Sequence, residues 1–121
     1  MAYELQIKVE DRIMNVHVRG ERDYETIKKV TSEILMKCKE NKCFKVLIDV
    51  RDFKNRIDTM EIFFLASADL PEIIKRKLEK VAIIDLKGFE EKIKFFEDVA
   101  RNRGHNVRIF TEYDEAINWL R

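Results

Sequence analysis

The stretch FKVLIDV, from Phe44 to Val50, decides the fold of this chain. Apolar residues occupy almost every position of it, whereas a strand with one face in water alternates apolar and polar residues. A second run, VAIID from Val81 to Asp85, has the same character. Strands that are apolar on both faces lie inside a parallel sheet, with helices covering them. The two stretches therefore predict an α/β domain with two central strands.

On the amino-terminal side of these strands, residues 3–9 alternate strictly between polar and apolar, and a second alternation follows through Met14, Val16 and Val18. This period of two indicates half-buried strands, and the short connection after Glu10-Asp11 predicts a hairpin. Residues 23–39 then change to steps of three and four, the period of an amphipathic helix. The apolar stripe of this helix consists of Tyr24, Ile27, Val30, Ile34, Leu35 and Cys38.

Helix and strand patterns continue to alternate after the first central strand. Asp58 and Glu61 have the spacing of a capping box and predict the start of a helix. Pro71 suits the first position of a further short helix, which we expect to end near Lys77. Both helices lie between the two central strands and form a crossover.

The carboxyl-terminal part predicts one more strand and two more helices. A long helix is expected over residues 89–103, with Phe89 on its apolar face and Gly104 as its stop. A strand follows at 107–110, and Thr111 has the spacing of a cap for a closing helix that contains Trp119. The order β-β-α-β-α-β-α-β-α predicts a mixed sheet of about five strands with packed helices, in a single domain spanning 1–121.

Composition excludes several classes of function. The chain of 121 residues has 24 basic and 23 acidic side chains, a net charge of +1, which gives no field for nucleic acid. It has no apolar run long enough to span a membrane and no signal peptide at its start, so we expect a cytoplasmic protein. Cys38 and Cys43 are then expected to be reduced thiols.

The residues that catalysis needs are missing from the sequence. The three glycines are scattered, so there is no phosphate-binding loop. His17 and His105 are the only histidines, and neither lies at a metal-ligand spacing from a carboxylate. Neither serine has the context of a nucleophile. We therefore expect no enzyme, no metal and no cofactor, and an enzyme of unknown type ranks only third, after the two binding roles given below.

One edge of the sheet collects polar residues that form a candidate binding site. Ligands of open parallel sheets bind beyond the carboxyl ends of the strands. That edge should carry Asp49, Arg51, Asp52, Asp85 and Lys87. The start of the second helix, Asp58-Thr59, should lie there too, and its free N–H groups would favour an anion. The alternative is a set of ordinary polar loops with one helix cap.

The segment 53–70 has more apolar residues than one helix can bury. The run Ile62-Phe63-Phe64-Leu65 wraps beyond a single stripe, and Met60 precedes it. The segment beginning at Pro71 could fold over this excess. Alternatively, Met60, Phe63 and Phe64 form an exposed apolar patch or the mouth of a pocket. Such a patch beside a helix start suits a ligand with an acidic head and an apolar tail, or an acidic partner helix.

Three stretches carry a resemblance to a known family: 45–51, 80–85, and 96–120 with FEDVARNRG, VRIFT and EAINWL. The whole chain resembles the STAS domains, most closely the SpoIIAA-like (STAS/SEC14-like) branch of small prokaryotic proteins. The resemblance implies a mixed five-stranded sheet and a non-enzymatic regulatory module that binds a protein partner. For the SEC14-like relatives it implies a carrier or sensor of a small apolar or lipid-like ligand instead. A homodimer is left open.

The sequence departs from the family's regulatory switch. Antagonists of anti-sigma factors have Asp-Ser-Ser-Gly at the start of the second helix, and the second serine accepts a phosphate. The matching stretch here is Asp58-Thr59-Met60-Glu61. Met60 has no hydroxyl and stands where the phosphoacceptor would be, which argues against a role in a sigma-factor switch.

Overall fold

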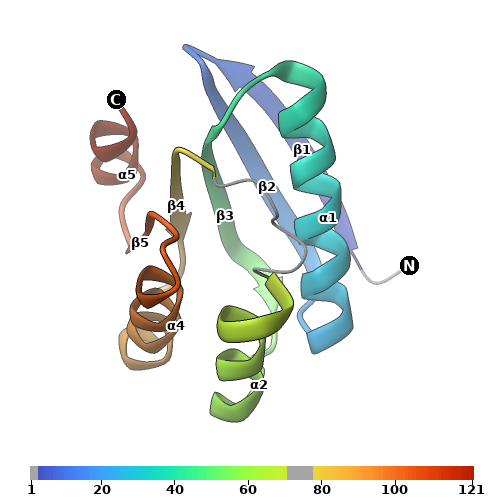
Figure 1. Cartoon of the computed structure of the whole chain (residues 1–121), viewed down its shortest axis with the longest axis vertical. Coiled ribbons are helices and arrows are strands. Elements are labelled where there is room, and N and C mark those ends of the chain that lie inside the picture. The colour runs from blue at the N-terminus through green and yellow to red at the C-terminus, as the bar shows by residue number, and fades with distance from the viewer. Residues whose placement is uncertain (1–2, 71–77) are drawn as a thin grey trace.

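Five strands form one mixed sheet in the computed structural model, which describes residues 3–70 and 78–121 (Figure 1). They are β1 (Tyr3–Glu10), β2 (Ile13–Glu21), β3 (Lys45–Lys54), β4 (Lys80–Ile84) and β5 (Val107–Phe110), and they lie side by side in chain order. β1 is antiparallel to β2, and β2 to β5 are parallel. The predicted fold class is confirmed. The short helix predicted over Pro71–Lys77 lies outside the described residues.

The helices are α1 (Tyr24–Asn41), α2 (Thr59–Phe64), the π-helical turn η1 (Leu65–Asp69), α4 (Glu90–Asn102) and α5 (Tyr113–Leu120). From β2 to β5 the strands advance across the sheet in one direction. Because crossovers between parallel strands are right-handed, the connections that contain α1, α2 and α4 must all cover the same face. α5 follows the last strand, is not a crossover, and packs on the opposite face against Leu47 and Ala82.

The two faces of the sheet have separate cores. Met14, Val16 and Val18 of β2 pack with Val30 and other α1 residues on the crossover face. On the other face, Ile13, Leu47, Ala82 and Ile84 pack with Ala116 and Leu120 of α5. Alternate side chains of one strand thus enter different cores, which is why β3 has consecutive apolar residues from Val46 to Ile48.

The hairpin and two helix ends are built as their sequences predict. Asp11 and Arg12 form the two-residue hairpin turn, with φ angles of 52° and 63°. The Asp58 carboxylate accepts a hydrogen bond from the backbone N–H of Glu61. The Glu61 carboxylate accepts one from the backbone N–H of Asp58, which completes the capping box. Gly104 follows α4 with a φ of 88°, a conformation that favours glycine.

Three details differ from the sequence-based expectations. α5 is preceded by Glu112, which makes no capping hydrogen bond, so the predicted cap at Thr111 is wrong. Phe89 lies before the first turn of α4 and remains 36% exposed instead of joining the apolar face. β3 extends to Lys54, and its pairing with β2 shifts register between His17 and Arg19.

Candidate functional site

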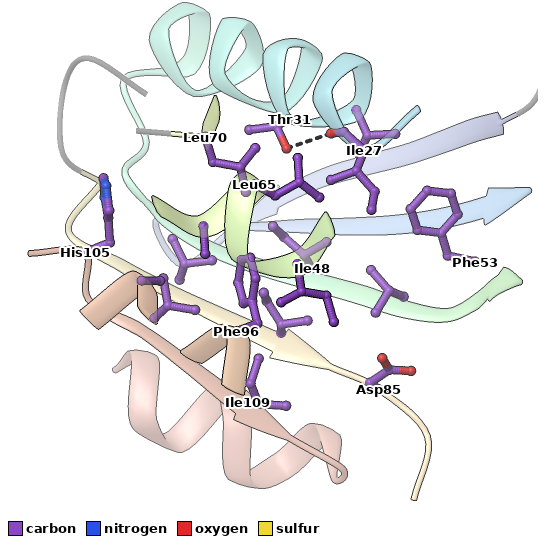
Figure 2. Close-up of a pocket in the computed structure, with 18 of the residues that line it drawn as sticks. Ile27, Thr31, Ile48, Phe53, Leu65, Leu70, Asp85, Phe96, His105 and Ile109 are labelled. Carbon is purple, nitrogen blue, oxygen red and sulfur yellow. Dashed lines mark hydrogen bonds between the residues drawn. The ribbon is translucent and has the colours of Figure 1, made fainter. Parts of the chain in front are cut away.

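A cavity of about 210 Å³ lies between the sheet and the crossover helices (Figure 2). Its floor consists of Ile48, Val50, Ile83 and Ile109, the residues of β3, β4 and β5 that face this side. Its opposite wall includes Ile27 of α1, Leu65 of η1 and Phe96 of α4. Figure 2 shows Asp85 and His105 towards opposite ends of this lining, so the cavity extends along the strand direction. Its walls suit an apolar molecule.

A cluster of three charged side chains lines the end of the cavity at the carboxyl ends of the strands. Asp85, 2% exposed, directly follows β4. Arg56 donates to both of its oxygens, from Nη1 to Oδ2 at 2.6 Å and from Nη2 to Oδ1 at 2.9 Å. Arg22 donates from Nη1 to Oδ2 at 3.4 Å. Two guanidinium groups therefore share one carboxylate, and the cluster has a net charge of +1.

Further contacts hold both guanidinium groups in place. Nε and Nη2 of Arg22 donate to the carbonyl of Phe53 at 3.2 and 2.9 Å, and Nη2 donates to the carbonyl of Val50 at 3.0 Å. Burial lowers the pKa of Arg22, the Asp85 carboxylate opposes that change, and the charge of Arg56 adds to it. The guanidinium of Arg56 stacks 3.7 Å from the centre of the Phe89 ring. This contact explains why Phe89 leaves the apolar face of α4.

The structure divides the predicted edge cluster between the two faces of the sheet. Asp85 lies on the cavity side, but Asp49 faces the α5 side and binds Arg51, with Nε and Nη2 at 3.0 and 2.8 Å from its oxygens. Asp52 pairs with Nε2 of His17 at 2.7 Å. The expectation that all these side chains share one site is wrong, because the shared edge of a sheet does not imply a shared face.

At the start of α2, the Asp58 carboxylate is used in the helix's own capping box. The Asp58 carboxylate accepts the backbone N–H of Glu61 at 2.8 Å, and Thr59 is exposed beside it. Lys87 is exposed in the connection between β4 and α4. Neither Thr59 nor Lys87 is among the residues that line the cavity.

The outward face of α2 presents large apolar side chains. Met60 is 64% exposed, Phe63 41% and Phe64 48%, and we call these three residues the α2 patch. The rings of Phe63 and Phe64 pack edge to face with their centres 5.9 Å apart. On the inward side, Ile62 and Leu65 are buried and line the cavity. α2 and η1 thus form a wall with the cavity on one side and the α2 patch on the other.

Arg22 and Arg56 are the functional candidates that sequence reasoning missed. Each lies in a polar connection, Arg22 between β2 and α1 and Arg56 between β3 and α2. In a chain with 24 basic residues, nothing local separates these two from the rest. Asp85 was the one residue that indicated such a partner, because a carboxylate directly after a buried strand needs a cation beside it.

The described ranges 3–70 and 78–121 contain neither a metal-binding group of side chains nor a membrane-spanning helix. Within them, no group of three or more His, Cys, Asp or Glu side chains could hold a metal ion. Of the helices in these ranges, none combines the length and the apolar character needed to cross a bilayer.

The fold is shared with solved structures of bacterial proteins. An anti-sigma factor antagonist from Mycobacterium paratuberculosis superposes with a TM-score of 0.61 at 10% identity, over 98% of this chain and 94% of that one. An uncharacterised protein with a SpoIIAA-like fold from Shewanella loihica PV-4 gives a TM-score of 0.56 at 16% identity, over 99% and 94%. At these identities the likeness shows the fold alone, which is that of the STAS and SpoIIAA-like proteins.

The family itself is shown by the sequence match. The SpoIIAA-like family model matches residues 13–121, so the chain belongs to the SpoIIAA-like family. No match is found among curated proteins.

Proposed function

We propose that the protein is a non-enzymatic STAS-type regulatory module that binds a partner protein through the α2 patch. The observation that carries this proposal is the exposure of Met60, Phe63 and Phe64 on one helix. Clustered apolar side chains on a surface mark sites of association. The fold is also that of a protein described as an anti-sigma factor antagonist. Met60 at the phosphoacceptor position supports a partner surface that is not switched by phosphorylation there.

Charged substitutions in the α2 patch test this function. Met60→Asp and Phe64→Asp should abolish capture of a specific partner from an extract of the host, because a carboxylate cannot enter an apolar interface without a large desolvation penalty. The matched control is Met36→Asp on α1, where the side chain is 60% exposed but lies outside the α2 patch.

The result is read with a melting temperature for each variant. Wild type and Met36→Asp should retain the same partner, and all variants should melt within a few degrees of one another. Retention of the partner by both patch variants would refute the proposal. If instead both variants unfold, the patch residues are structural and the partner surface lies elsewhere.

The cavity favours a second candidate function, that of a carrier or sensor of a small apolar ligand. An apolar cavity of about 150 Å³ already holds a benzene molecule, and this one has about 210 Å³. Native mass spectrometry of protein purified from its own host should show an added mass that denaturation releases. Protein that carries no such mass, and whose melting temperature no apolar compound raises, would count against the carrier role.

A further inference from the structure

We propose that the cavity binds a small apolar carboxylate, with its head group on Arg22 and Arg56 and its tail along the strands. This inference rests on the second candidate function, ligand binding in the cavity, and adds the chemical class of the ligand. It is independent of the α2 patch.

The charges at the Asp85 end of the cavity do not balance. The side chains of Arg22 and Asp85 retain only 12% and 2% exposure, and that of Arg56 retains 19%. Of the described residues, Asp85 is the only one whose carboxylate lies within ion-pair distance of either guanidinium. A largely buried excess positive charge is unfavourable unless an anion accompanies it. A ligand with one negative charge would bring the cluster to neutrality.

The N–H donors of Arg22 and Arg56 are arranged to bind a carboxylate. A guanidinium has five N–H donors, and Asp85 accepts two from Arg56. The bond from Arg22 to Asp85 is the long one, at 3.4 Å. The Phe53 carbonyl and the Phe89 ring fix the two guanidinium planes, so little conformational entropy remains to be lost on binding. Planar forks held in this way match the two oxygens of a carboxylate.

Beyond the charged cluster, the cavity extends along the strands and could hold an apolar tail. Val81 and Asp85 both line the cavity and lie four residues apart on one strand direction, roughly 13 Å at about 3.3 Å per residue. The side chains between them on this face are apolar, Ile83 on β4 and Ile48 and Val50 on β3. A tail extending from the head group along these strands would therefore meet mainly apolar walls, the polar or charged lining residues outside the cluster being Thr31, Lys92, His105 and Asn106.

The excess positive charge also determines which head groups the cavity should bind weakly. A primary amine with the same tail would place a cation beside two guanidinium groups, and a neutral alcohol would leave the excess charge unbalanced. Affinity should fall in the order octanoate, 1-octanol, octylamine.

The experiment titrates these three probes into the full chain and follows the Arg Nε–H and Ile methyl signals by NMR. Octanoate should bind about tenfold more tightly than 1-octanol, the value expected for one charge-assisted hydrogen-bonded pair. It should shift the Nε–H signals of Arg22 and Arg56 together with the methyl signals of Ile48 and Ile83. Octylamine should bind more weakly than both.

Two variants change the affinity in opposite directions. Arg56→Gln should weaken octanoate about tenfold and leave 1-octanol unchanged. Asp85→Asn removes the carboxylate that competes for the arginines and should tighten octanoate several-fold, a gain that structural damage cannot imitate. The matched control is Arg108→Gln, an exposed arginine of β5 that does not line the cavity, which should leave both affinities unchanged.

The outcomes separate the head group from the cavity. If octanoate and 1-octanol bind equally well, or octylamine binds best, the carboxylate class is overturned while ligand binding in the cavity stands. If none of the three probes binds the wild-type chain, the carboxylate proposal and the carrier role both fail. The wild-type comparison decides the question even where a variant does not fold.

Discussion

Gly104 is the residue at which backbone conformation most restricts side-chain choice at the end of α4. Its φ of 88° places it where a Cβ is strained. Gly104→Ala should lower the free energy of unfolding by about 1 kcal/mol or more. Urea denaturation measures this, with Asn102→Ala in the last turn of α4 as the control that should change it by less than about 0.5 kcal/mol. An unchanged midpoint for Gly104→Ala would show that the helix end relaxes.

Cys38 should be an unreactive thiol whose ionisation destabilises the fold. Burial, with a smaller contribution from Cys43, raises the pKa of the Cys38 thiol to about 11 from an ordinary 9.0. Because the unfolded chain ionises first, the free energy of unfolding should fall as pH rises from 9 towards 11. Below pH 9 this thiol should have no effect on stability.

Thiol labelling provides the measurement for Cys38. At neutral pH a disulfide reagent should react with it slowly in the folded protein and rapidly in urea, because the thiolate is the reactive form. Because Cys43 is also a buried free thiol, Cys38→Ala should remove one of two slow reactions, and it should make the stability profile between pH 9 and 11 flatter. Fast labelling of the folded protein would contradict the burial of this side chain.

At the scale of single residues, the sequence predicted Asp85 as a site residue but not the two arginines that bind it. Asp85 was predicted because it follows a buried strand at the carboxyl edge of the sheet, where ligands of parallel sheets bind. Arg22 and Arg56 were not, because they lie 34 positions apart in two different loops and only folding brings them together. Pairings of this range leave no local pattern in one sequence.

Among the elements, the β1–β2 hairpin contains a turn that can be improved. Asp11 and Arg12 both have positive φ angles, 52° and 63°, at an exposed two-residue turn. Such turns favour Asn-Gly, since glycine adopts this conformation without strain. Arg12→Gly should raise the free energy of unfolding by about 1 kcal/mol. Arg19→Gly, in the interior of β2, is the contrasting variant and should lower it; a loss of stability from both would contradict the turn assignment.

Trp119 connects the last helix to the edge of the sheet. Its ring lies 5.8 Å from that of Phe110 and 5.2 Å from Nζ of Lys80, and it packs partly buried against the α5 core. Trp119→Ala should cost roughly 2–3 kcal/mol, towards the lower end for large aromatic residues because burial is incomplete. Calorimetry would measure this. Tyr113→Ala on the same helix, 45% exposed, should cost clearly less.

At the scale of elements, periodicity predicted each described strand and helix but not the details of their ends. Strand and helix periods come from which side is buried, and the sequence records this directly. The start of α5 was misplaced because Thr111 and Asp114 have the capping spacing without making the cap. The register shift between β2 and β3 has no such signature, and it belongs to the region where Asp49 and Asp52 turn away from the cavity.

For the whole molecule, the order of elements was enough to predict the mixed sheet, because parallel strands need right-handed crossovers. The same rule places α1, α2 and α4 on one face. The cavity could not be predicted, since it depends on how completely three helices fill the space above β3, β4 and β5. The excess of apolar residues in 53–70 was its only trace, and the structure divides that excess between the cavity wall and the α2 patch.

The agreement between strand order in the sheet and strand order in the chain also bears on kinetics. Each strand pairs only with its neighbours in sequence, so no pairing requires the closure of a loop that spans another strand. Pairing in sequence order keeps the contact order below that of a sheet whose strands pair across the chain, and folding rates rise as contact order falls. The hairpin can form first and each crossover can then add one strand, so the growing sheet always has a single new edge to complete. A nascent chain could assemble this sheet in the order in which it is synthesised.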